Sequence, residues 1–117
     1  MSKTNIRIFH NPRCSKSRAA LALLIEKGIT PEVVDYLKTP PTPEELRKLL
    51  TMLGMKPVEL VRTGEEIYKQ HYTGRTLSDE EWLNALATHP ILIERPIVVC
   101  GNQAVVARPP EKVLELL

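Results

Sequence analysis

Apolar and polar positions alternate along the first part of the chain in a way that predicts a βαβ unit. Residues 6–9 (Ile-Arg-Ile-Phe) have the period of a short strand, which Asn11-Pro12 ends. Residues 32–37 form a second strand-like run after an intervening helix-forming segment. Two strands joined by a helix within about 35 residues are expected to be parallel, with a right-handed crossover.

The helix between these strands is expected to begin at about Ser15. Its residues 19–25 are apolar almost all round, which predicts burial over much of the helix surface. Gly28 is placed to end the helix in a left-handed conformation. Ile29 is placed to make the hydrophobic contact that often follows such a cap.

The middle of the chain has the pattern of a helical insert. Thr42 and Ser78 are each followed three residues later by a glutamate, Glu45 and Glu81, which is typical of a capping box. After each box, apolar or aromatic residues share one helical face. These faces are Leu46, Leu49, Leu50 and Leu53, and then Trp82, Ala85, Leu86 and His89. Two shorter helical segments are expected, over 57–61 and 65–70.

The last part of the chain returns to strands. An apolar run over 91–99 is interrupted by Glu94-Arg95-Pro96, and Gly101-Asn102 then predicts a two-residue hairpin turn. Residues 103–107 are expected to return antiparallel to the preceding strand. Pro109-Pro110 opens a last helix that continues to the end of the chain.

This order of elements, βαβ, helical insert, ββ and α, predicts the fold class. We expect an α/β protein with the thioredoxin-like arrangement, in which helices flank a four-stranded mixed sheet. We expect one domain over residues 1–117, with the helical insert at about 43–89.

Composition excludes several classes of protein. The chain has 117 residues, 43% of them hydrophobic, and a formal net charge of +2, which is too small to argue for nucleic-acid binding. No apolar run approaches the roughly 18 residues of a membrane span, so no membrane association is expected. Two widely separated cysteines cannot form a disulfide scaffold, which favours a reduced, cytoplasmic protein.

The charge is unevenly distributed along the chain. No acid precedes Glu26, whereas five basic residues do: Lys3, Arg7, Arg13, Lys16 and Arg18. A targeting segment is also basic and acid-poor, but no cleavage pattern of small residues follows the apolar run here. The interpretation we favour is a positive site for an anion.

Cys14 lies between the first predicted strand and helix. The start of a helix has unpaired N–H groups and a partial positive charge, so a thiolate is stabilised there. Arg13, Lys16 and Arg18 form a supporting basic loop. Their positive charges oppose the helix dipole, but a thiolate or a bound oxyanion at this point would make the same charges favourable. The alternative is a small buried hydrophobe. Cys100, at the end of an apolar strand, fits that packing role better than Cys14 does.

Three cysteine chemistries do not fit this sequence. A dithiol redox pair requires Cys-x-x-Cys, but the fourth position is Ser17. A phosphatase loop requires an arginine six residues after its cysteine, where this chain has Ala20. The histidines and cysteines lack the spacing of zinc ligands, so we expect no metal and no bound cofactor. A monothiol nucleophile that depends on an external thiol remains.

Two polar residues near Cys14 are candidates for acting on its sulfur. His10 is four residues earlier and could influence the thiolate, or it could be a solvated histidine at a strand end. Ser17 is one helical turn later and could donate a hydrogen bond to the sulfur, or it could be an ordinary first-turn serine.

Three arginines occur at the ends of predicted elements. Arg62 follows a short helix, Arg95 precedes a proline within an apolar run, and Arg108 follows the hairpin. Each one alone is more typical of a surface residue. Loops at strand ends are nevertheless where α/β sheets build their sites, and arginine suits bidentate binding of an oxyanion. The bond between Arg95 and its proline can also be cis.

Two segments together resemble the glutaredoxin-linked arsenate reductase family. They are residues 10–18, His-Asn-Pro-Arg-Cys-Ser-Lys-Ser-Arg, and 89–99, His-Pro-Ile-Leu-Ile-Glu-Arg-Pro-Ile-Val-Val. Further matches in order and spacing are Tyr36-Leu37 with Pro40-Pro41, Leu60-Val61-Arg62 and Arg108-Pro109. The resemblance covers essentially the whole chain and implies a thioredoxin-like fold with a helical insert. One departure is that this chain ends at Leu117, whereas well-known members continue into a longer C-terminal tail.

The resemblance also implies roles for the candidate residues. Cys14 matches the nucleophile that attacks arsenate, and His10 and Ser17 match positions that help to keep the thiol ionised. The arginines that bind the oxyanion and its reduced product are matched by Arg62, Arg95 and Arg108. In the family mechanism the thiol–arsenate adduct takes up a glutathione, glutaredoxin reduces the mixed disulfide, and arsenite leaves.

Two other functions remain open from the sequence. Relatives of the same fold bind RNA polymerase as transcriptional regulators. They often contain a Cys-x-x-Cys redox switch, whose second cysteine is replaced here by Ser17. A reductase for another small anion, or for a glutathione mixed disulfide, would use the same residues. We expect a monomer, because no amphipathic stripe is left over once the core is filled.

Overall fold

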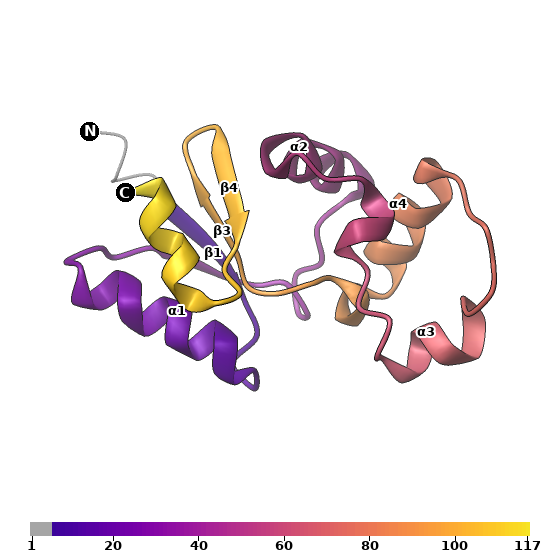
Figure 1. Cartoon of the computed structure of the whole chain (residues 1–117), viewed down its shortest axis with the longest axis horizontal. Coiled ribbons are helices and arrows are strands. Elements are labelled where there is room, and N and C mark those ends of the chain that lie inside the picture. Colours follow the sequence, from indigo (N-terminus) through magenta and orange to yellow (C-terminus); the bar gives the residue numbers. More distant parts are fainter. Residues whose placement is uncertain (1–5) are drawn as a thin grey trace. The chain divides into compact units, whose positions relative to one another are not determined.

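The computed structural model describes residues 6–117, which Figure 1 traces from the first strand to the last helical turn. Contacts between residues divide the chain into two compact units. The sheet unit consists of Met1–Thr39 and Arg95–Leu117, and the helical unit is Pro40–Glu94. The predicted insert lies within the helical unit, and the assignment of a single domain stays a prediction.

The sheet unit contains a four-stranded mixed sheet in the order β2-β1-β3-β4, which confirms the predicted fold class. β1 (Ile6–His10) and β2 (Glu32–Asp35) are parallel. β3 (Ile97–Cys100) is antiparallel both to β1 and to β4 (Gln103–Val106).

This topology brings several strand ends to one edge of the sheet. His10 and Asp35, the last residues of β1 and β2, lie opposite each other. Ile97, the first residue of β3, lies opposite Phe9 of β1 and opposite Val106 at the end of β4. The loops after β1, β2 and β4 and the segment before β3 therefore meet at this edge, which we call the loop edge.

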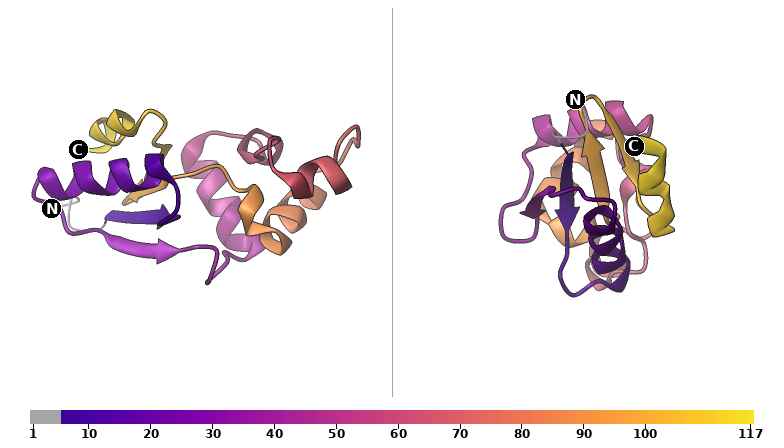
Figure 2. Two further views of the ribbon diagram at one scale, coloured as in Figure 1. Left: turned by 90° about the horizontal axis from the view of Figure 1, so that it is seen from below. Right: turned by 90° about the vertical axis from the view of Figure 1, so that its left-hand side faces the viewer.

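Two helical segments cover the same face of this sheet (Figure 2, left), namely α1 (Ser15–Glu26) and the 3-10 helix η4 (Pro110–Leu116). Leu24 of α1 and Val113 of η4 are fully buried in one cluster with Val98 of β3. Burial of each such aliphatic side chain contributes roughly 1.5–3 kcal/mol, so this aliphatic layer holds α1 in place on the sheet.

The expectation that α1 is buried over much of its surface is wrong. The buried residues of this helix, Ser17, Ala20 and Leu24, form a single stripe, whereas Ile25 is 60% exposed. In the sheet unit α1 packs mainly against β1 and η4, which cover one side of a helix. The apolar composition of residues 19–25 therefore predicted more buried surface than α1 has.

The predicted end of α1 is confirmed. Gly28 has a φ of +81°, a left-handed conformation that glycine adopts without strain. Its N–H donates to the carbonyl of Ile25 (2.9 Å), and the N–H of Ile29 donates to that of Leu24 (3.0 Å). This is the Schellman arrangement, and Ile29 packs against the core as expected.

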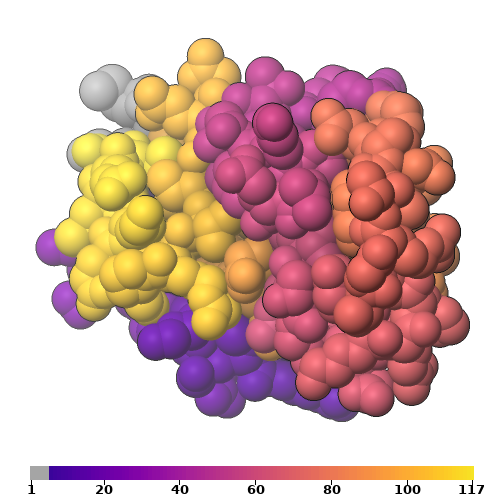
Figure 3. Space-filling view, turned by 45° about the vertical axis from the view of Figure 1, so that its right-hand side comes forward, coloured from indigo at the N-terminus to yellow at the C-terminus, as the bar shows by residue number. Residues whose placement is uncertain are grey.

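Two elements differ from their predicted form. β2 ends at Asp35 because the Asp35 carboxylate accepts a hydrogen bond from the N–H of Leu37 (3.2 Å), which turns the chain. The last helix is of the tighter 3-10 type, with the N–H of Lys112 donating to the carbonyl of Pro109 (3.0 Å). In Figure 3 this yellow segment lies on the surface beside the β3–β4 hairpin.

The helical unit is organised around α2 (Pro43–Leu53) and α4 (Asp79–Thr88), which pack against each other. Their buried residues are Leu46, Leu49 and Leu50, and Trp82, Leu83, Ala85 and Leu86. The shorter elements are η2 (Pro57–Leu60), α3 (Glu66–His71) and η3 (Pro90–Leu92). Among residues 6–117, no helix is both long enough and apolar enough to cross a membrane.

Both predicted capping boxes are present. The hydroxyl of Thr42 accepts a hydrogen bond from the N–H of Glu45 (3.1 Å), whose carboxylate accepts one from the N–H of Thr42 (2.9 Å). Ser78 and Glu81 form the same pair of bonds at 3.2 and 2.8 Å. Each box satisfies N–H groups that would otherwise lack a partner at the start of a helix.

Loss of a cap is expected to weaken the helical unit measurably. Thr42→Ala removes the side-chain acceptor for the N–H of Glu45 and should lower the free energy of unfolding by about 1 kcal/mol. The exposed loop residue Thr76 provides a matched control, since Thr76→Ala removes no cap. Urea unfolding followed by circular dichroism measures both, and equal stability of the two variants would contradict the capping account.

Candidate active site

Cys14 is the N-cap residue of α1 and lies at the loop edge, just beyond β1. Its N–H donates to the carbonyl of Asn11 (3.0 Å), and its carbonyl accepts the first helical hydrogen bond, from the N–H of Arg18 (3.0 Å). The first turn of α1 contains no acidic residue. Cys14 therefore stands at the positive end of the helix, without a carboxylate from that turn to oppose a thiolate.

Asn11 holds the loop before Cys14 in shape, a role that sequence reasoning missed. Its carbonyl accepts from Cys14, its side-chain oxygen accepts from the N–H of Arg13 (3.0 Å), and its own N–H donates to the hydroxyl of Ser17 (3.2 Å). Asn11 is 7% exposed, and its bond to the hydroxyl of Ser17 is buried. The Asn-Pro pair was the available signal, because asparagine commonly bonds to the backbone two residues later.

Ser17 is fully buried in the first turn of α1. Its hydroxyl oxygen accepts the hydrogen bond from Asn11 and so joins the loop after β1 to the helix. The hydroxyl proton remains available for a further hydrogen bond, because a serine both donates and accepts. Ser17 therefore has a structural role in joining the loop to the helix. A hydrogen bond from its hydroxyl to the sulfur of Cys14 stays a prediction.

His10 ends β1 and is 7% exposed, so it is not the solvated strand-end histidine of the alternative interpretation. Burial lowers the pKa of its imidazole below the ordinary value of 6.5; Asp35 opposes this shift, and Arg18 adds to it. Nδ1 of His10 is buried and has no hydrogen-bond partner within residues 6–117. Burial therefore favours the uncharged form of this imidazole.

The supporting basic loop is exposed. Arg13, Lys16 and Arg18 all face solvent around the start of α1, as the sequence predicts for a positive surface there. Lys3, which also belongs to the basic beginning of the chain, lies outside the described residues.

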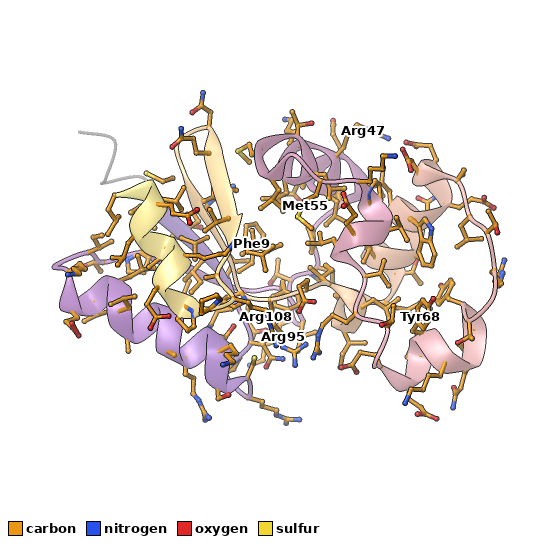
Figure 4. All side chains as sticks on the ribbon, viewed as in Figure 1. Phe9, Arg47, Met55, Tyr68, Arg95 and Arg108 are labelled. Atoms are coloured by element: carbon orange, nitrogen blue, oxygen red, sulfur yellow. The ribbon has the colours of Figure 1, made fainter. Side chains whose placement is uncertain are left out.

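Arg95 and Arg108 flank the β3–β4 hairpin and reach the same loop edge. Nη1 of Arg108 donates to the carbonyl of Arg95 (3.2 Å), and the two residues lie close together in Figure 4. Nε and Nη1 of Arg95 are buried, whereas Arg108 is exposed. The peptide bonds from each arginine to the following proline, Pro96 and Pro109, are both cis.

Arg62 belongs to the helical unit, where two carboxylates hold its guanidinium. Nη1 lies 2.6 Å from Oε2 of Glu65, and Nε lies 3.5 Å from Oε1 of Glu94. Its backbone N–H donates to the carbonyl of Leu92 (2.7 Å). The Arg62 side chain is therefore fixed by charge within its own unit, and its participation with Cys14 stays a prediction.

Cys100 lies at the opposite edge of the sheet. It ends β3 and pairs with Ile6, the first described residue of β1, whereas Cys14 follows the far end of that strand. Cys100 is buried in the aliphatic cluster between the sheet and α1. Its predicted packing role is confirmed.

Comparison with known proteins identifies the family. The sequence pattern of the ArsC family matches residues 9–116. The arsenate reductase of Neisseria meningitidis serogroup A is 46% identical over 114 residues, which cover 96% of this chain and 97% of the relative. This chain belongs to the ArsC family. The resemblance seen in the sequence is thus confirmed at the level of the family.

Two further relatives show the extent of the similarity. The "Uncharacterized protein YfgD" of Escherichia coli is 49% identical over 114 residues, covering 96% of each chain. The solved structure of the arsenate reductase from Vibrio cholerae is 52% identical, with a TM-score of 0.93, and the match covers 97% of this chain and 98% of that one. The thioredoxin-like arrangement expected from the sequence is therefore confirmed.

Within this ArsC family fold, most of the predicted site residues lie at the loop edge. The sheet unit brings together His10, Cys14, Ser17, Arg95 and Arg108 there. A thiol at a positive helix end, with guanidinium groups at the same edge, is an arrangement suited to nucleophilic attack on an oxyanion. Phosphate-like and arsenate-like anions meet these requirements.

The lowered pKa of His10 makes stability depend on pH. Below about pH 6.5 the unfolded chain takes up a proton at His10 more readily than the folded chain does, so the free energy of unfolding should fall as the pH drops below this value. His10→Gln should remove this part of the fall. Urea unfolding at each pH measures the slopes. Parallel slopes for the wild type and His10→Gln would contradict a buried neutral imidazole.

Proposed function

We propose that this chain reduces arsenate to arsenite, with Cys14 as the nucleophile and with glutathione and glutaredoxin as electron donors. The observation that supports the proposal most is the placement of Cys14 at the start of α1, at the same edge of the sheet as Arg95 and Arg108. The names of the similar Neisseria and Vibrio proteins, both called arsenate reductases, support arsenate as the substrate.

Arsenate binding is assigned to the cations of the loop edge. The Arg95 and Arg108 guanidinium groups can each donate two parallel hydrogen bonds to oxygens of a tetrahedral anion. Backbone N–H groups at the start of α1 add to this binding, since they have no partner within the helix. Arg62 is included in the proposal only through its match to the family motif, and within the helical unit Glu65 and Glu94 hold its guanidinium.

The first step forms a bond between sulfur and arsenic. The Cys14 thiolate attacks As(V), an oxygen leaves as water after protonation, and no electrons change hands. The helix end and the basic loop favour the thiolate over the thiol. Burial lowers the pKa of His10, which favours its uncharged imidazole beside this loop.

The electrons come from two external thiols. Glutathione replaces a second oxygen on arsenic, again with loss of water, so that arsenic bears both sulfurs. The glutaredoxin thiolate then attacks the glutathione sulfur: an S–S bond forms, the As–S bond to glutathione breaks, and its electron pair reduces As(V) to As(III). Water finally releases arsenite and returns Cys14 as the thiol. The absence of a second cysteine in a Cys-x-x-Cys pair fits this dependence on external thiols.

The proposal predicts arsenate-dependent turnover that requires Cys14. The assay follows NADPH oxidation in a mixture of arsenate, glutathione, glutathione reductase, glutaredoxin and the purified protein. Cys14→Ser should reduce the rate to background, because an alcohol at this position is too poor a nucleophile at neutral pH.

Cys100→Ala is the matched control, since it removes the other thiol at the opposite edge of the sheet. This variant should retain most of the wild-type rate. An arsenate-dependent rate that is absent from the wild type, or unchanged in Cys14→Ser, would overturn the proposal. Turnover with another small anion but not with arsenate would overturn the choice of substrate.

A further inference from the structure

A pocket lies beside the loop that precedes Cys14, on the side facing the end of β2. Its volume is about 400 Å³, within the range of roughly 300–1,000 Å³ that is usual for small-molecule sites. It is lined by Asn11, Pro12, Arg13, Asp35, Leu37 and Lys38. One wall is the loop that ends at Arg13, one residue before Cys14. The other wall is the end of β2 and the turn that follows it.

Hydrogen bonds fix the backbone of both walls before any ligand binds. On the β2 side, the Asp35 carboxylate accepts from the N–H of Leu37 (3.2 Å), and the Asp35 carbonyl accepts from that of Lys38 (3.1 Å). On the other side, the Asn11 side chain accepts from the N–H of Arg13 (3.0 Å). A site whose walls are already ordered loses little entropy on binding.

The charges on the walls indicate the kind of ligand. Arg13 and Lys38 provide two cations, and Asp35 provides one carboxylate, all on the lining of the same pocket. A simple oxyanion would be repelled by the carboxylate, so it does not explain this set of charges. A molecule with two carboxylates and one ammonium complements all three groups. Glutathione has these charges, and its peptide backbone can lie against the apolar side chains of Pro12 and Leu37.

We propose that this pocket binds the charged ends of glutathione and directs its thiol to the arsenic held on Cys14. The inference rests on the proposed function and gives its co-substrate a binding site. In the step served by this site, the glutathione sulfur forms a bond to As(V), and one oxygen leaves as water with the thiol proton. Arg13 and Lys38 bind the carboxylates, and Asp35 binds the ammonium group.

The direct test uses S-methylglutathione, which has the same charges but cannot react at sulfur. In a titration of the ¹⁵N-labelled protein, saturable shifts are expected at the amides of Asn11, Arg13, Leu37 and Lys38. Lys38→Glu should weaken binding about tenfold, because an attraction becomes a repulsion, and Lys38→Arg should restore it. Lys27→Glu makes the same charge change at the exposed far end of α1 and should leave binding unchanged. Shifts at other residues, no shifts, or equal affinity in Lys38→Glu would overturn the proposal.

A kinetic test separates the site from the reaction. In the coupled assay, Lys38→Glu should raise the KM for glutathione about tenfold and leave the KM for arsenate unchanged. If the KM for glutaredoxin rises instead, the pocket is part of a protein docking surface and the glutathione assignment is wrong. If S-methylglutathione binds as expected but arsenate is not reduced, the pocket is a glutathione site and the proposed function fails.

Discussion

A single buried hydrogen bond, from the N–H of Asn11 to the hydroxyl of Ser17, joins the end of β1 to the first turn of α1. The position of Cys14 depends on it, because the carbonyl of Asn11 also accepts from the N–H of Cys14. Loss of such a bond in the interior leaves an N–H without a partner and costs about 1–3 kcal/mol. The sulfur is therefore attached at a fixed point at the positive end of the helix.

The rest of the site follows from the register of the sheet. Because β3 is antiparallel to β1, the segments before β3 and after β4 return to the edge where the Cys14 loop begins. Arg95 and Arg108 therefore lie at the loop edge, although they are far from Cys14 in the sequence. Cations beside a helix start oppose its dipole, so this arrangement lowers stability until a thiolate or an oxyanion neutralises it. The concentration of charge is thus better explained by anion chemistry than by folding.

Local signals in the sequence predicted local structure well. The capping boxes, the Schellman end at Gly28 and the packing role of Cys100 each depend on a few neighbouring residues, and all are present. The exposed half of α1 could not be predicted, because composition does not show how many neighbours a helix has. The pairing of Arg62 with Glu94 depends on a contact between distant segments, and the bonds of Asn11 depend on the fold of its loop.

The hydrogen bond from Asn11 to Ser17 holds Cys14 at the positive end of α1. The rate at which iodoacetamide alkylates Cys14 at pH 7, resolved from Cys100 by mass spectrometry, tests this role of the bond. Ser17→Ala should slow the alkylation of Cys14, because the sulfur is then no longer held at the start of the helix. Ser15→Ala, a change at an exposed first-turn serine, should behave like the wild type. Equal rates in the wild type and in Ser17→Ala would show that the bond does not position Cys14.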